Sequence, residues 1–106
     1  MKTISVTELK QKFDNNEEFQ LIDVREQDEV EICKISGSTH IPMGEIPART
    51  EEIKTDVPVI VHCRSGKRSA NVINYLEMNF DLKNLINLEG GILEWGNVID
   101  SSITQY

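Results

Sequence analysis

A cysteine followed by three basic residues and a glycine is the part of this sequence best suited to chemistry. The β-branched run Val59–Val61 is typical of a buried strand, and it leads through His62 to Cys63 and a short cationic loop. A turn between a strand and a helix gathers backbone N–H groups and a helix N-terminus, and both favour negative charge. Because the thiolate is the nucleophilic form of cysteine, this environment should lower the pKa of Cys63 and increase its reactivity.

A purely structural role for Cys63 is the alternative, because cysteine is among the most buried residue types and often packs as a small apolar side chain. A packing cysteine does not require three cations in the next five residues, however. Gly66 also permits a backbone conformation that other residues disfavour, as a tight cradle around an anion would need. We therefore predict that Cys63 is catalytic, and that the residues after it bind an anionic substrate: Arg64, Ser65, Gly66, Lys67, Arg68 and Ser69.

The composition indicates an ordinary globular protein with one cationic spot. The chain has 106 residues, 39% of them hydrophobic and 27% charged, and its formal net charge is −7. This length predicts a single domain over residues 1–106. Three of the 11 basic residues lie between Arg64 and Arg68, which leaves 8 basic against 18 acidic residues elsewhere. Such a balance disfavours nucleic acid as a partner and favours a small anion.

Several kinds of site and compartment are disfavoured by the sequence. No apolar run resembles a signal peptide or reaches membrane-spanning length, and two cysteines make no disulfide framework. We therefore expect a cytoplasmic protein with no membrane partner. A zinc site built from Cys33, His40, His62 and Cys63 would lack paired-ligand spacing, so we expect no metal and no other cofactor.

The rest of the chain alternates short strands with helices. Strands are expected at Thr3–Ser5, Phe19–Val24, Thr39–Ile41, Pro58–His62 and Leu85–Leu88. Helices are expected from a Ser5/Glu8 capping box to about Asp14, over Gln27–Ile32 and Ser69–Phe80, and from the Gly90-Gly91 turn through Trp95. Residues 43–57 are expected to be irregular, with a brief helix near Arg49–Ile53. In the third helix, the residues expected on the buried face are Val72, Ile73, Leu76 and Phe80.

This alternation predicts an α/β fold with a mainly parallel central sheet and helices on both faces. In such sheets the working site lies beyond the carboxyl ends of the strands. Cys63 is expected at such an end, directly after the central strand.

With these elements in place, the sequence resembles the single-domain rhodanese-like sulfurtransferases of the thiosulfate sulfurtransferase family. Leu21–Arg25 is similar to the early strand motif, Ile35–Pro42 to the segment before the second motif, and Val59–Ser69 to the active-site strand and loop. The Glu89–Ile92 run and Trp95 also fit. One departure is clear: the family commonly has Gly-His-Ile before the glycine of the middle segment, and this chain has Cys33-Lys34-Ile35.

The resemblance implies a rhodanese-like fold and a two-step sulfur transfer. The Cys63 thiolate would attack the outer sulfur of a donor such as thiosulfate, forming a persulfide and releasing sulfite. The resemblance also implies an acceptor that removes this sulfur: a thiol, cyanide, thioredoxin or another sulfur-carrier protein.

Two other functions remain as alternatives to sulfur transfer. The first is a non-catalytic interaction module with the same fold, which the intact Cys63 and its cations disfavour. The second is a phosphatase or arsenate reductase. Such enzymes carry a related loop with five residues where this chain has four between Cys63 and Arg68, so the shorter loop favours sulfur.

Polar residues outside the loop have structural interpretations beside functional ones. Asp23 and Arg25 are expected to form a structural salt bridge or strand-end hydrogen bond, with bracing of the active-site loop as the alternative. A base role for His62 is doubtful, because successive strand side chains point to opposite faces and it directly precedes Cys63. His40 is expected to be a packed strand histidine.

The remaining candidates are Cys33, Trp95 and the acidic segment Glu26–Glu31. Cys33 would be a resolving thiol only if it lay close to Cys63. Trp95 is expected in the core or at its rim. The acidic segment is expected to be a solvated helix face, or else a surface for a basic partner.

Overall fold

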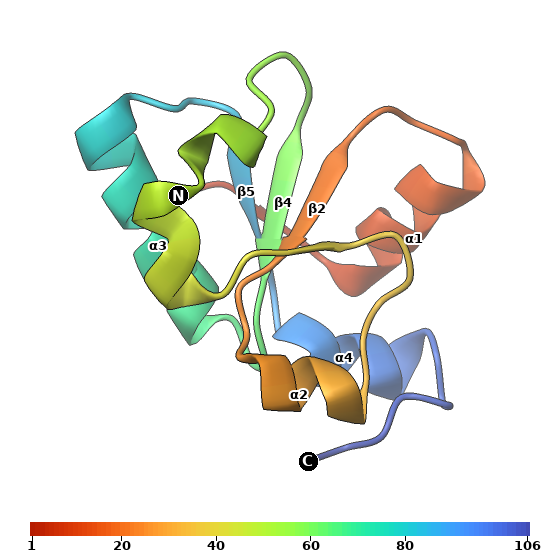
Figure 1. Cartoon of the computed structure of the whole chain (residues 1–106). Coiled ribbons are helices and arrows are strands. Elements are labelled where there is room, and N and C mark those ends of the chain that lie inside the picture. Colours follow the sequence, from red (N-terminus) through yellow and green to blue (C-terminus); the bar gives the residue numbers. More distant parts are fainter.

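The computed structural model describes residues 1–106 as an α/β fold around one five-stranded sheet (Figure 1). The strands are β1 (Thr3–Ile4), β2 (Gln20–Asp23), β3 (Thr39–His40), β4 (Val59–His62) and β5 (Leu85–Leu88). They lie in the order β1-β5-β4-β2-β3, and all four neighbouring pairs are parallel. The predicted mainly parallel sheet is therefore entirely parallel, with β4 at its centre.

Four α-helices and two 3₁₀-helices accompany these strands, and the last α-helix follows the last strand. They are α1 (Val6–Asp14), α2 (Gln27–Ile32), η1 (Met43–Ala48), η2 (Thr50–Glu52), α3 (Lys67–Phe80) and α4 (Gly91–Val98). The prediction of irregular structure is wrong for Met43–Ala48, because a short 3₁₀ segment lacks the 3.6-residue period by which helices are recognised. The brief helix expected just after it is confirmed as η2.

Two of the α-helices differ in length from the prediction. Helix α3 begins at Lys67, two residues before the expected start, because Gly66 takes a left-handed conformation (φ 109°) and serves as its N-cap. Helix α4 continues beyond Trp95 to Val98. The start of α3 is therefore set by the backbone conformation of Gly66 rather than by the hydrophobic period.

The first helix is fixed by the predicted capping box. The Ser5 hydroxyl accepts a hydrogen bond from the Glu8 N–H (3.1 Å), and the Glu8 carboxylate accepts one from the Ser5 N–H (3.0 Å). This places Leu9, which is fully buried, on the face of α1 that meets the core.

The sheet is buried on both faces, as expected for parallel strands that helices connect. Val59 and Val61 of β4 pack into the cluster that contains the α3 side chains, whereas Ile60 packs into the cluster of α1 and α4. Trp95 belongs to the second cluster, so its prediction as a core residue is confirmed. None of the helices combines the length and the apolar character that crossing a membrane requires.

The prediction that Phe80 lies on the buried face of its helix is wrong. Phe80 is 42% exposed, whereas Val72, Ile73 and Leu76 of the same helix are buried. Phe80 is the last residue of α3, and its ring lies 5.8 Å from that of Tyr75 on the outside of the helix. The periodic pattern therefore continues one turn further than the buried face.

Candidate active site

Cys63 directly follows β4 at the carboxyl edge of the sheet, as predicted. The loop then leads into α3, and the first turn of α4 holds it from the side. The Ile92 N–H donates to the Cys63 carbonyl (3.0 Å), and the Leu93 N–H donates to the Arg64 carbonyl (3.2 Å). Gly91 (φ 59°) makes this approach possible, because a Cβ there would overlap both carbonyl groups.

The Cys63 sulfur is buried and faces backbone donors. The residue is 1% exposed. Its Sγ accepts hydrogen bonds from the N–H of Gly66 (3.1 Å) and of Ser69 (3.5 Å), and the Ser69 hydroxyl lies 3.4 Å away. Burial raises the pKa of the thiol, but hydrogen bonding with Ser69 and with the N–H groups of Gly66 and Ser65 lowers it more. The pKa of Cys63 therefore lies below its ordinary value, as the sequence led us to expect.

The three loop cations have different surroundings. Arg68 forms a bidentate pair with Glu29 of α2 (2.6 and 2.8 Å), and Arg64 lies over the Tyr106 ring, 4.8 Å from its centroid. Lys67 is exposed and makes neither an ion pair nor a hydrogen bond. The roles of these three side chains in substrate binding remain predictions, and Lys67 is the cation that no side chain engages.

The pairing of Glu29 corrects the interpretation of its helix as a solvated acidic face. The Glu29 side chain is only 15% exposed. Its carboxylate also accepts a hydrogen bond from the Tyr106 hydroxyl (2.8 Å). The hydrogen bonds from Arg68 lower the pKa of Glu29 to about 2. The solvated-face prediction is therefore wrong at this residue, because a partner 39 positions later in the chain covers it.

Asn87 of β5 is a site residue that the sequence analysis missed. Its Oδ1 accepts a hydrogen bond from the Ser69 hydroxyl (2.6 Å), and its Nδ2 donates to the Gly66 carbonyl (3.1 Å). Asn87 is 8% exposed. The available signal was a polar residue within the otherwise apolar strand Leu85–Leu88, since buried amides usually have specific partners.

Comparison with known proteins identifies the family of this fold. A model of the rhodanese-like domain matches residues 5–97. The chain belongs to the rhodanese-like domain family. This confirms the resemblance seen in the sequence.

Relatives of this rhodanese-like domain carry sulfurtransferase names. It is 44% identical to "Putative sulfurtransferase YtwF" of Bacillus subtilis, over 90% of each chain. It is 37% identical to a protein named sulfurtransferase from Allochromatium vinosum, over 82% of this chain and 80% of that one. A rhodanese-like domain protein from Staphylococcus aureus has a crystal structure that superposes with a TM-score of 0.84 at 34% identity, covering 91% and 92% of the two chains. These relatives support a role in sulfur transfer.

Next to α2, this rhodanese-like domain holds a fully buried ion pair. Arg25 binds Asp23 through Nε (3.0 and 3.2 Å) and Nη2 (2.8 Å), and both side chains are at most 1% exposed. The expected structural salt bridge is therefore confirmed. Arg25 also donates to the carbonyls of Cys33 (2.7 Å) and Glu29 (3.3 Å) and to the Tyr106 hydroxyl (3.0 Å). The pair thereby fixes α2 against the sheet and supports the residue that binds Arg68.

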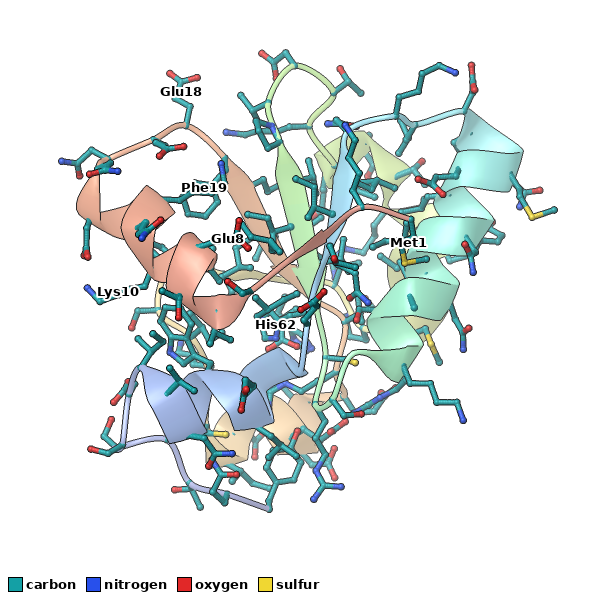
Figure 2. All side chains as sticks on the ribbon, turned by 180° about the vertical axis from the view of Figure 1, so that it is seen from behind. Met1, Glu8, Lys10, Glu18, Phe19 and His62 are labelled. Atoms are coloured by element: carbon teal, nitrogen blue, oxygen red, sulfur yellow. The ribbon has the colours of Figure 1, made fainter.

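The two histidines do not contact the sulfur of Cys63. His62 (labelled in Figure 2) is fully buried, with Nε2 3.7 Å from an Asp23 oxygen and Nδ1 3.4 Å from the Cys63 carbonyl. Burial lowers the pKa of His62, although Asp23 opposes this. His40 donates from Nε2 to the Arg25 carbonyl (2.6 Å) and is partly buried, as expected for a packed strand histidine.

The structure does not bring the second cysteine to the site. The Cys33 thiol lies 3.4 Å from the Thr104 carbonyl and 3.9 Å from Nη1 of Arg25, and both cysteines are free. These contacts give no support to a resolving role against Cys63. In the segment that departs from the family pattern, Ile35 enters the core and Lys34 is exposed. No group of three or more His, Cys, Asp or Glu side chains is arranged to hold a metal ion.

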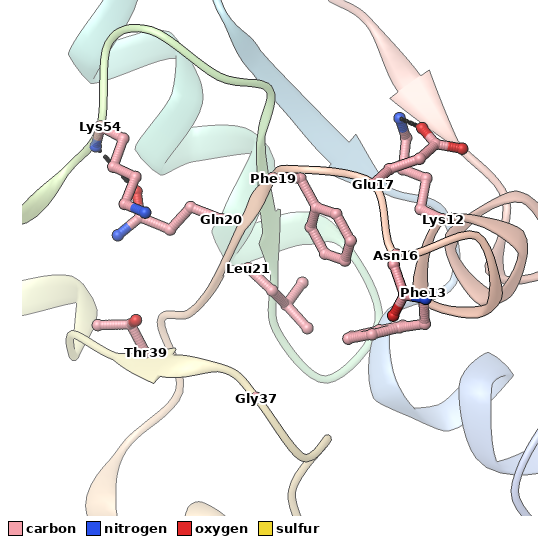
Figure 3. A pocket seen from close by; sticks show the side chains of 10 residues that line it. All are labelled: Lys12, Phe13, Asn16, Glu17, Phe19, Gln20, Leu21, Gly37, Thr39 and Lys54. Carbon is pink, nitrogen blue, oxygen red and sulfur yellow. Dashed lines mark hydrogen bonds and ion pairs between the residues drawn. The ribbon is translucent and has the colours of Figure 1, made fainter.

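A cavity of about 430 Å³ is lined by residues outside the cysteine loop (Figure 3). Its walls come from α1, the segment between α1 and β2, strands β2 and β3, and the loops that contain Gly37 and Lys54. The lining residues are Lys12, Phe13, Asn16, Glu17, Phe19, Gln20, Leu21, Gly37, Thr39 and Lys54. None of them belongs to the loop of Cys63.

Proposed function

We propose that this rhodanese-like domain is a sulfurtransferase that moves sulfane sulfur from thiosulfate or a persulfide donor to a nucleophilic acceptor through a Cys63 persulfide. The observation that carries the proposal is the sulfur of Cys63, which has a lowered pKa and accepts two backbone N–H groups at the end of the central strand. Relatives named sulfurtransferase support the same kind of transfer.

In the first step, the Cys63 thiolate attacks the outer sulfur of the donor. A bond forms between the two sulfurs while the sulfur–sulfur bond of thiosulfate breaks, and sulfite leaves with the electron pair of that bond. The backbone N–H groups of the loop and the exposed charge of Lys67 offset the repulsion between thiolate and dianion. Because Cys63 is buried, the reacting sulfur of the donor has to enter the loop.

In the second step, the acceptor attacks the outer sulfur of the persulfide. The Cys63 sulfur leaves as a thiolate, which the N–H groups of Gly66 and Ser69 again stabilise. The proposed acceptors are cyanide, a small thiol, thioredoxin or another sulfur-carrier protein. No metal or other cofactor is needed for either step.

Intact mass spectrometry after incubation with thiosulfate tests the proposal. The protein should gain the mass of one sulfur atom, and cyanide or a dithiol should remove it. Cys33→Ser should behave in the same way, whereas Cys63→Ser should gain nothing. An unchanged mass of the unsubstituted protein would contradict sulfur transfer from thiosulfate, and Cys63-dependent hydrolysis of p-nitrophenyl phosphate would favour the phosphatase alternative.

The charge of Lys67 provides a second test. Lys67→Ala should reduce the rate with thiosulfate by about 10²-fold, the usual effect of removing one group that stabilises transition-state charge. Lys83→Ala is the matched control, because Lys83 is an exposed lysine that pairs with Asp81. Equal rates in the two variants would show that the charge of Lys67 does not contribute to the reaction with thiosulfate.

A further inference from the structure

Asn87 connects the two residues whose N–H groups hold the Cys63 sulfur. It lies on β5 opposite Val61 of β4, the strand that Cys63 directly follows. Its amide reaches Gly66 through Nδ2 and Ser69 through Oδ1. Asn87 itself makes no hydrogen bond to the sulfur, so any effect on Cys63 passes through these neighbours.

The direction of each hydrogen bond follows from the chemistry of the groups. The Gly66 carbonyl can only accept, so the NH₂ of Asn87 faces it and the amide oxygen faces Ser69. That oxygen also only accepts, so the Ser69 hydroxyl donates its proton to Asn87 at 2.6 Å. A serine hydroxyl has one proton. Toward Cys63, the Ser69 oxygen therefore presents a lone pair.

A lone pair at this position distinguishes the two states of Cys63. The Ser69 oxygen, 3.4 Å from Sγ, can accept the S–H of the neutral thiol. It stabilises the thiolate only if the hydroxyl proton turns to the sulfur, and the buried Asn87 oxygen then loses its donor. Asn87 and the thiolate thus compete for one proton.

We propose that Asn87 is a positioning residue that limits the fraction of Cys63 thiolate by holding the Ser69 hydroxyl proton. This inference rests on the proposed sulfur transfer for its functional meaning. Once the persulfide has formed, the inner sulfur carries neither a proton nor a full charge, and the hydroxyl returns to Asn87. Asn87 therefore favours both the resting thiol and the persulfide over the intermediate thiolate.

The test measures the acidity of Cys63 without any sulfur donor, so its outcome is independent of the outcome with thiosulfate. The rate of alkylation by iodoacetamide is measured as a function of pH in a Cys33→Ser background, where Cys63 is the only cysteine that can react. Asn87→Leu, of similar volume and with no acceptor, releases the hydroxyl to the thiolate. We expect the acid dissociation constant of the thiol to increase about tenfold, as one added hydrogen bond to a charged group would give.

Ser69→Ala provides the matched background. Without the hydroxyl there is no proton to compete for, so Asn87→Leu combined with Ser69→Ala should leave the dissociation constant as it is in Ser69→Ala alone. An unchanged or smaller dissociation constant in Asn87→Leu would overturn the proposal. An equal increase in both backgrounds would also overturn it, because the effect would then not pass through Ser69.

Two further measurements keep the test decisive if Asn87→Leu does not fold. Asn87→Val, with a β-branched side chain suited to a strand, should give the same increase. Ser69→Ala alone should change the dissociation constant by less than about threefold, since the hydroxyl proton is already engaged by Asn87. A tenfold decrease in Ser69→Ala would show that the hydroxyl donates freely to the thiolate, which contradicts the proposal.

Discussion

Glu29→Gln should lower the free energy of unfolding at pH 7 by about 1–2 kcal/mol. Arg68, the main cause, lowers the pKa of Glu29 from the ordinary 4.5 to about 2. Since each pKa unit corresponds to about 1.4 kcal/mol, the full shift would be worth about 3 kcal/mol. The Arg68 side chain is 30% exposed, so water screens the pair and we take about half of that value.

The pH dependence has a definite sign. Folding lowers the pKa of Glu29, so its contribution is complete above the unfolded value of 4.5 and is lost as the pH falls toward 2. The difference between the unsubstituted protein and Glu29→Gln should therefore shrink between these two pH values. Urea unfolding at pH 7, 4 and 2.5, followed by the fluorescence of the single tryptophan, Trp95, measures it.

Glu31→Gln is the control for loss of charge on the same helix. Glu31 is exposed and accepts a hydrogen bond only from Gln27, so its replacement should change the stability by less than about 0.5 kcal/mol. An equal loss for Glu29→Gln at pH 7 and pH 2.5 would refute the electrostatic explanation and indicate altered packing. No loss at pH 7 would show that the pair with Arg68 contributes nothing.

Three other substitutions test the fold around the site. Arg25→Met should cost about 3–5 kcal/mol in urea unfolding, because it leaves the buried carboxylate of Asp23 without its partner. Ile73→Ala, at a fully buried position of α3, should cost about 2–5 kcal/mol in the same assay. Gly91→Ala should cost at least about 1 kcal/mol in the same assay, because the new Cβ would displace the carbonyl of Cys63. It should also slow the alkylation of Cys63, and unchanged alkylation would show that the loop tolerates the shift.

The fold could be predicted from the sequence because its elements are local. A run of β-branched residues before Cys63 marked β4, and the Ser5/Glu8 pair marked the start of α1. The 3₁₀-helix at Met43–Ala48 escaped prediction since it has no period of 3.6 residues. Phe80 followed the period but lies beyond the buried face, and only the packing of α3 could reveal this.

The site was predicted less completely, because its contacts join distant parts of the chain. The loop itself is continuous in sequence, so Cys63 and its neighbours could be found. The pairing of Arg68 with Glu29 and the hydrogen bonds of Asn87 join residues that lie 39 positions, and 18 or 21 positions, apart. A single sequence does not show which distant residues come into contact. Charge alone therefore suggested three free cations, whereas Arg68 already has an acidic partner.

This distribution of charge bears on how the loop could hold an anion. Glu29 neutralises Arg68, so Arg64 and Lys67 supply two positive charges. The proposed thiosulfate dianion and the Cys63 thiolate would together bring three negative charges. The remaining negative charge would be stabilised by oriented backbone N–H groups, which need no reorganisation to do so. These groups depend on the backbone of the loop, which α4 and Asn87 hold in place through hydrogen bonds. The hydrogen bonds from α4 and Asn87 that hold the loop are therefore as important to the proposed chemistry as the cations of the loop.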